Sequence, residues 1–338
     1  MSIYNVGDQA RAYALQMATG RLKSTMTTLS SEMASGETAD VGKRLNGNTL
    51  TLSSIEARLA SMAQYQRNAS DAAMLTRGLQ DVLEAVRQDA AHLGVELATD
   101  PFRDANDALA IRANHATMIF DGAVQRLNGA VGGRFLLSGL ASDRPPLASA
   151  AQMLDRLATV TSGMTDAGEI ASAITAWFDA PPGGNGFLDN AYAGTLGQSQ
   201  QIKVAEDMSV AIGTSAASPA VRDVLKGLAM AAILDRGVLP GQQDQRGALL
   251  GMAGRSLLAA EHGLIGEKGR IGLTEQVVDR ARSTSAAAMS TLELSRAEIR
   301  SVDAFETAAA LKEVDGQLET LYAVTARLSK LKLVDYLR

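Results

Sequence analysis

The sequence of 338 residues contains no cysteine and few aromatic residues. Disulfide bonds and thiolate metal sites are therefore excluded. Phe, Tyr and Trp make up only 4% of the chain, whereas a compact enzyme of this size usually buries more aromatic surface. The hydrophobic share of 46% comes mainly from Ala, Leu, Val and Met, a composition that favours long helices packed in thin layers.

A basic surplus and a long apolar run are also missing. The net charge of −5 argues against binding to nucleic acid, because such domains carry an excess of Lys and Arg. The longest apolar run, residues 228–234, is far shorter than the ~20 residues that span a bilayer, so we expect no membrane insertion. The first residues contain neither a basic nor a continuous apolar segment, so we expect no cleaved signal peptide.

Proline is confined to the middle of the chain. All seven prolines lie between positions 101 and 240. Because proline inside a helix costs ~3 kcal/mol or more, both proline-free flanks can be continuously helical. Apolar spacing predicts helices over 3–33, ended by Ser35-Gly36, and over 49–98, 104–130 and from 272 to the C-terminus.

The middle of the chain has a mixed pattern. It predicts a short strand at 134–139, two short helices within 148–178, strands within 187–213, and a helix that opens at Ser218-Pro219. The glycine-rich stretch 266–272 lacks the residue order of a phosphate-binding loop, and we expect a flexible break between two helices there.

These patterns predict a mainly α fold. The N- and C-terminal flanks form an elongated antiparallel long-helix bundle or coiled coil, with a small mixed α/β central insert. The expected divisions are terminal coiled-coil segments at 1–42 and 300–338, a long-helix core with short strands at 43–147 and 190–299, and the insert at 148–189.

No group of residues points to catalysis, a cofactor or a metal. His92, His115 and His262 are far apart and have no metal-ligand spacing. Ser138 lacks the upstream glycine of a nucleophile elbow. The carboxylates are spread along helices beside other polar residues, which is typical of a solvated face. We therefore expect a protein that is not an enzyme and that carries neither cofactor nor metal ion.

Both termini carry apolar stripes at helical spacing. The two ends could simply bury each other, but a two-helix pair covers one seam only, and each buried side chain is worth ~1.5–3 kcal/mol. We therefore expect the stripes to contact partner chains as well as each other. The predicted interface residues are Ile3, Val6, Tyr13, Met17, Leu22, Met26 and Leu29 in the first flank, and Leu311, Val314, Leu318, Leu321, Val324, Leu328, Leu331 and Leu337 in the last.

Several segments resemble the flagellin-like family of bacterial flagellar axial proteins, most closely its hook–filament junction members (hook-associated protein 3). The C-terminus carries the strongest resemblance, with a Tyr-Leu pair near its end after a Leu-Ser-x-Leu run. The matching segments are 134–139, 143–146, 192–194, 216–228, 301–307, 317–322 and 327–337.

The resemblance implies a structural role outside the cell. The termini would form the coiled-coil inner layer of a tubular assembly, with 49–130 and 272–299 as the next helical layer and the insert facing outward. The implied partners are hook-associated protein 1, flagellin subunits, copies of the chain in a ring, and an export chaperone on the C-terminal helix. Export through the flagellar type III apparatus would need no cleaved signal.

Two other functions are compatible with the same sequence. A flagellin would polymerise with itself into the filament, and a cytoplasmic coiled-coil scaffold would use the same stripes inside the cell. Open-ended polymerisation would favour the first alternative, and retention inside the cell would favour the second.

Overall fold

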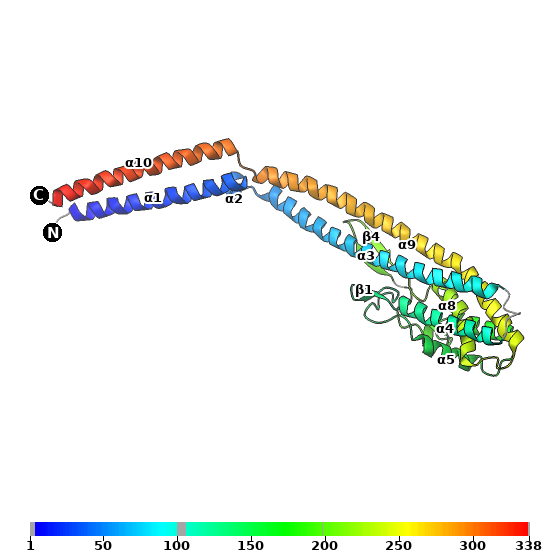
Figure 1. The fold of residues 1–338 in the computed structure, drawn as a ribbon. Coiled ribbons are helices and arrows are strands. Elements are labelled where there is room, and N and C mark those ends of the chain that lie inside the picture. The colour runs from blue at the N-terminus through cyan, green and yellow to red at the C-terminus, as the bar shows by residue number, and fades with distance from the viewer. Residues whose placement is uncertain (1–3, 100–105, 198, 337–338) are drawn as a thin grey trace. The chain divides into compact units, whose positions relative to one another are not determined.

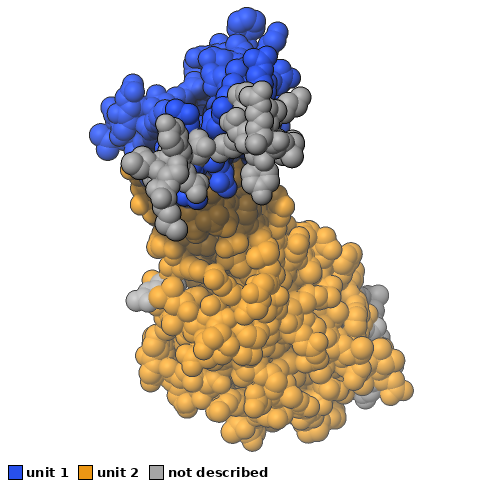
Figure 2. Space-filling view, turned by 90° about the vertical axis from the view of Figure 1, so that its left-hand side faces the viewer, with its two compact units in different colours: residues 1–62, 287–338 blue, residues 63–286 orange. Residues whose placement is uncertain are grey.

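The computed structural model describes residues 4–99, 106–197 and 199–336, which form two compact units. Unit 1 comprises residues 1–62 and 287–338, and unit 2 comprises residues 63–286 (Figures 1 and 2). The elements are α1 Tyr4–Ser35, α2 Val41–Arg44, α3 Leu50–Ala98, α4 Asn106–Leu127, β1 Ala130–Val131, β2 Arg134–Phe135, α5 Ala150–Val160, α6 Ala167–Asp179, α7 Phe187–Asn190, β3 Gln200–Lys203, β4 Ser209–Ile212, α8 Pro219–Ala232, the 3-10 helix η2 Ile233–Arg236, α9 Gln243–Arg300 and α10 Ala304–Tyr336. The predicted mainly α fold of long helices with a small mixed insert is confirmed.

In unit 1, α1 and α10 run antiparallel beside each other (Figure 1). Gly36, with a φ of +71°, ends α1 at the level where α9 gives way to α10. Two backbone hydrogen bonds join these breaks, from Thr38 N to Arg300 O (2.8 Å) and from Val302 N to Gly36 O (3.0 Å). An ion pair of 2.8 Å between Arg300 and Glu37 reinforces them, so the breaks in the two flanks are held in register.

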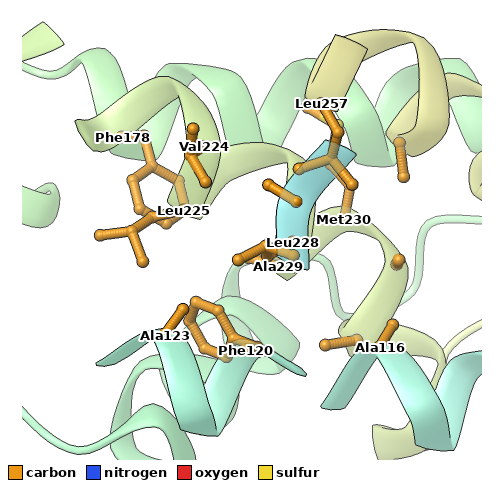
Figure 3. Close-up of a cluster of buried hydrophobic side chains, with 14 of the residues drawn as sticks. Ala116, Phe120, Ala123, Phe178, Val224, Leu225, Leu228, Ala229, Met230 and Leu257 are labelled. Carbon is orange, nitrogen blue, oxygen red and sulfur yellow. The ribbon is translucent and has the colours of Figure 1, made fainter. Parts of the chain in front are cut away.

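The core of unit 2 lies where α4 packs on α8. Figure 3 shows Phe120 of α4 facing the apolar side of α8, with Leu257 of α9 and Phe178 of α6 closing the cluster. Helix α8 is buried on nearly all sides, because Ala and Gly between its larger residues let neighbouring helices approach. Helices α5 and α6 share this core through Leu154, Leu157 and Ile174.

Helices α3 and α9 approach closely at two glycines. A Cβ on Gly254 of α9 would lie 2.7 Å from Ala98 N and 2.9 Å from the carbonyl oxygen of Gly94 in α3. A Cβ on Gly94 would in turn lie 3.2 Å from the Cβ of Leu257. Only glycine fits at Gly254, because the obstructing atoms belong to the backbone and cannot rotate away.

An ion-pair network joins the same two helices further along. The carboxylate of Glu84 in α3 accepts hydrogen bonds from Arg87 (2.8 Å) and Gln88 (2.7 Å) and pairs with Lys268 of α9. Arg87 also pairs with Glu261 of α9. The hydrogen bonds from Arg87 and then Lys268 hold the pKa of Glu84 well below its ordinary value of 4.5, so Glu84 is ionised at neutral pH.

Two antiparallel hairpins pack against the long helices. Hairpin β1–β2 pairs Ala130 with Phe135, and hairpin β3–β4 pairs Gln200 with Ile212. Ile202, Val204 and Val210 of the second hairpin bury themselves against α3 and α9 in a smaller apolar cluster. The second hairpin therefore buries part of the surface of α3 and α9, and the two hairpins remain separate two-stranded sheets.

Three local predictions differ from the structure. The break predicted at 266–272 is wrong, because α9 continues through this stretch without interruption. Leu264 and Ile271 are buried on either side of its glycines, and this packing offsets the ~1 kcal/mol that each helical glycine costs. Within 187–213 the first four residues form helix α7 instead of a strand, and only Arg134 and Phe135 of 134–139 lie in a strand.

The close approach at Gly254 generates a matched pair of variants on one helix. We expect Gly254→Ala to lower the free energy of unfolding by about 1–3 kcal/mol, because its methyl group would overpack against the backbone of α3. Gly266→Ala should instead raise it by about 0.5–1 kcal/mol, because the same helix has open space at that position. Urea denaturation of the full chain measures both changes, and equal effects would contradict the contact.

Candidate partner interface on the terminal helices

The seam between α1 and α10 is narrow. On α1 it uses Leu15, Leu22 and Leu29, which recur every seven residues and are half-buried. On α10 it uses Thr307, Val314 and Leu321 at the same spacing, with Leu318 beside them. A seven-residue repeat keeps one line of side chains facing the partner helix, as in a coiled coil.

Little of this helix pair is buried. Thr307, Val314 and Leu318 on α10 are 5–9% exposed, whereas no side chain described on α1, residues 9–35, is buried. Packing against a single partner helix covers about one side of α1 and leaves the rest to solvent. The α1–α10 pair is thus a layer with no second layer over it in unit 1.

The predicted N-terminal stripe lies on two faces of α1 instead of one. Tyr13 is 66% exposed and Met17 46% exposed, on the side of the helix opposite the seam residues Leu22 and Leu29. The physical reason is the five-residue step from Met17 to Leu22, which rotates the stripe by about 140° at 3.6 residues per turn. Tyr13 and Met17 are therefore free for another chain while Leu22 pairs with α10.

The exposed apolar residues of α10 gather at the same end of the pair. The Nζ of Lys23 lies 5.9 Å from the ring centroid of Tyr322, which fixes the antiparallel register. Val324 (42% exposed) and Leu328 (37%) follow Tyr322 along α10, so they lie in the half of the pair that is far from the joint at Gly36, as Tyr13 and Met17 do. Tyr13 and Met17 on the outer side of α1, and Val324 and Leu328 on α10, are two exposed apolar groups at this end of the pair, and we refer to these four residues as the distal apolar patch.

Side chains between the charged positions of α1 keep its outer face nearly neutral. Ala10, Ala14, Gly20, Ser24 and Ser31 are all exposed and carry no charge. The exposed Arg21 lies on the same side as Ala10 and Ala14, because it is eleven and seven residues from them. The outer side of α1 is therefore suited to contact with an apolar or neutral helix that leaves the guanidinium of Arg21 in water.

The structure locates most of the predicted interface residues, and their contact with partner chains stays a prediction. Leu22, Met26, Leu29, Leu311 and Leu321 are half-buried, Val314 and Leu318 are buried, and Tyr13, Met17, Val324 and Leu328 are exposed. Val6 lies in α1 and Leu331 in α10, whereas Ile3 and Leu337 lie outside the described residues.

Sequence reasoning missed Leu15 and Thr307 as members of the seam. Both could have been found from the seven-residue spacing 15–22–29 and 307–314–321, which is more regular than the mixed steps of three, four and five used to define the stripes. Phe305 was also missed, and it is 86% exposed on the outer side of α10.

Unit 2 offers few places for chemistry. A pocket of about 140 Å³ lies between α3, β4 and α9, and Glu267 is its buried carboxylate. Its Oε1 accepts a hydrogen bond from the hydroxyl of Thr214, and its Oε2 forms an ion pair with Arg270 without a hydrogen bond of its own. In the described part of the chain there is no group of three or more acidic or histidine side chains that could hold a metal, and no helix long and apolar enough to cross a bilayer.

Comparison with known proteins gives a likeness in structure only. No protein-family model and no curated protein sequence matches the chain. The structure of FlgL from Bacillus cereus has a TM-score of 0.50 and 14% identity, covering 72% of this chain and 99% of that one. A putative flagellar hook-associated protein from Vibrio parahaemolyticus has a TM-score of 0.52 and 11% identity, with 75% and 99% covered. The chain therefore shares the fold of these proteins.

The seam predicts that α1 and α10 depend on each other. We expect Leu318→Ala to cost the helix pair about 2 kcal/mol and to lower the helical circular dichroism signal of the free chain, because Leu318 is 5% exposed in the seam. The thermal midpoint of unit 2 should not change. Lys312→Ala, at an exposed position of the same helix, is the control and should leave the signal intact. An unchanged signal in Leu318→Ala would contradict the seam.

Proposed function

We propose that this protein is a structural subunit of the bacterial flagellum, a junction adaptor that connects the hook, through hook-associated protein 1, to the filament. The observation that carries the proposal is the α1–α10 pair, in which no described side chain of α1 is buried. The fold shared with FlgL and with a putative flagellar hook-associated protein supports this setting.

The energetics of the helix pair favour an assembled state. Full burial of one apolar side chain is worth ~1.5–3 kcal/mol, so covering the four side chains of the distal apolar patch supplies several kcal/mol. This gain repeats for every subunit that adds to the assembly. A subunit with such termini is marginally ordered alone and becomes stable on incorporation, which suits a protein that is exported before it assembles.

The proposed partners follow from this arrangement. Copies of the chain would stand side by side in a ring, with hook-associated protein 1 on one side and flagellin subunits on the other. The exposed face of α10 is suited to an export chaperone, because Tyr322, Val324 and Leu328 are open to solvent. The protein would act outside the cell after type III export.

A purely mechanical role needs no active site, and we propose that the protein is not an enzyme. The buried carboxylate of Glu267 is compatible with this, since its contacts with Thr214 and Arg270 are typical of a structural ion pair. Ser138, which is also buried, donates its hydroxyl hydrogen bond to the carbonyl of Arg144 and has no base beside it among the described residues.

The alternative function that most resembles a junction adaptor is that of a flagellin. Both functions use paired terminal helices, but a flagellin adds to itself without limit whereas an adaptor forms a layer of fixed size. Purified chain seeded with filament fragments separates the two functions. Continuous growth of filament from this chain alone would replace the adaptor with the flagellin.

The distal apolar patch gives the direct test. We expect Tyr13→Glu combined with Met17→Glu to abolish incorporation into flagella in a strain that lacks the wild-type chain, because two carboxylates cannot be covered by an apolar neighbour. Both positions lie outside the α1–α10 seam, so the pair of helices should survive. The measurement is the amount of chain in sheared flagella, together with the attachment of filaments.

Val160→Glu is the matched control, because Val160 is 40% exposed on α5, which belongs to unit 2 and not to the terminal helices. It should incorporate normally. Normal incorporation of the double variant as well would show that the distal apolar patch is not an interface.

A further inference from the structure

Unit 2 carries two exposed apolar helix faces in addition to the termini. On α4, Ile111 (70% exposed) and Met118 (66%) point away from the core, opposite the buried residues Ala113 and Phe120. On α9, Leu273 (66%) does the same opposite Leu264 and Ile271, and Ile265 (53%) is exposed about 100° around the helix from Leu264. Large apolar side chains that are so exposed at two helix faces indicate contact surfaces.

The two faces have complementary shapes. Between Ile265 and Leu273 the α9 face carries Gly266 and Gly269, and open space surrounds the position of a Cβ on each. This gap is a shallow hollow about two helical turns long, because eight residues separate Ile265 from Leu273. A long, flexible side chain such as Met118 can fill a hollow of that size, because methionine adapts to irregular gaps.

The charges around the two faces are complementary as well. Arg280 is exposed on the α9 face, and the nearby carboxylates point elsewhere or are paired. Those pairs are Glu261 with Arg87, Glu267 with Arg270, and Asp279 with Arg282. On α4, Asp107 is exposed and has no ion-pair partner within the described ranges, and the one basic residue in the last turn, Arg126, pairs with Asp89.

One antiparallel register satisfies both kinds of complementarity. If Met118 sits over Gly269, then Asp107 lies across from Arg280, because each charge is eleven residues, or ~16.5 Å, from its reference position. In the same register Ile265 faces Gly122 of α4. Met118 and Ile265 thus each meet a glycine, Ile111 and Leu273 lie opposite Gln276 and Asn114, and Asp107 meets Arg280.

We propose that the outer face of α4 in one copy of the chain docks antiparallel on the outer face of α9 in a second copy. The contact is heterologous, because it joins two different faces, so it propagates from subunit to subunit and closes a ring or builds a helix. It rests on the proposed function in that it assigns the surfaces through which neighbouring subunits of the junction would touch.

The chain's lack of cysteine allows a direct test. Two full-length variants, Met118→Cys and Gly269→Cys, are mixed at high concentration and treated with a short bismaleimide, one of them isotope-labelled. We expect a dimer that contains one copy of each variant, at a yield several-fold above that from either variant alone. Val160→Cys mixed with Gly269→Cys measures the background from random collision.

Charge reversal then tests the register. Asp107→Arg in the Met118→Cys chain should lower the mixed-dimer yield several-fold, and Arg280→Asp in the Gly269→Cys chain should restore it. A mixed yield no higher than the Val160→Cys background would overturn the proposal, as would a dominant dimer between two Met118→Cys chains.

The cross-linking test uses purified chain and does not involve the distal apolar patch. If the chain cross-links as expected but never enters flagella, the proposed function is wrong and the contact between α4 and α9 stands. If the chain enters flagella but gives no mixed dimer, the contact is wrong and the proposed function stands.

Discussion

Antiparallel pairing of the two proline-free flanks occurs in both units, as α1 with α10 in unit 1 and α3 with α9 in unit 2. Every other element depends on it, because it brings into contact residues far apart in sequence, such as Gly94 and Gly254 in unit 2 or Lys23 and Tyr322 in unit 1. In unit 2 the pair is locked by the glycines at 94 and 254 and by the charged network around Glu84. In unit 1 it rests on a single seam and on the joint at Gly36.

The two helix pairs differ in how much of their apolar surface is buried within their own unit. Helices α4, α8, α5 and α6 supply a second layer over the α3–α9 pair, so Leu79, Leu83 and Leu93 are fully buried. The α1–α10 pair has no such layer in its unit. Since the free energy of burial scales with the apolar area removed from water, unit 2 is stable by itself and unit 1 gains most from neighbours.

Much of the fold could be predicted from the sequence, because proline and apolar spacing act locally. The long helices and their ends at Gly36 and Ala98 follow from those signals. The continuity of α9 could not be predicted, since the glycines at 266 and 269 weaken the helix locally and the burial of Leu264 and Ile271 that offsets them is tertiary. The apolar residues of α1 were predicted to lie on one face, because the prediction did not account for the five-residue step from Met17 to Leu22 among steps of three and four.

We propose that partner chains cover the faces of the α1–α10 pair that are exposed in unit 1. Amide hydrogen exchange of the chain, free in solution and within sheared flagella, tests it most directly. The account predicts rapid exchange of α1 and α10 in the free chain, strong protection of both in flagella, and equal protection of unit 2 in the two states. Terminal helices that are already as protected in the free chain as unit 2 would contradict it.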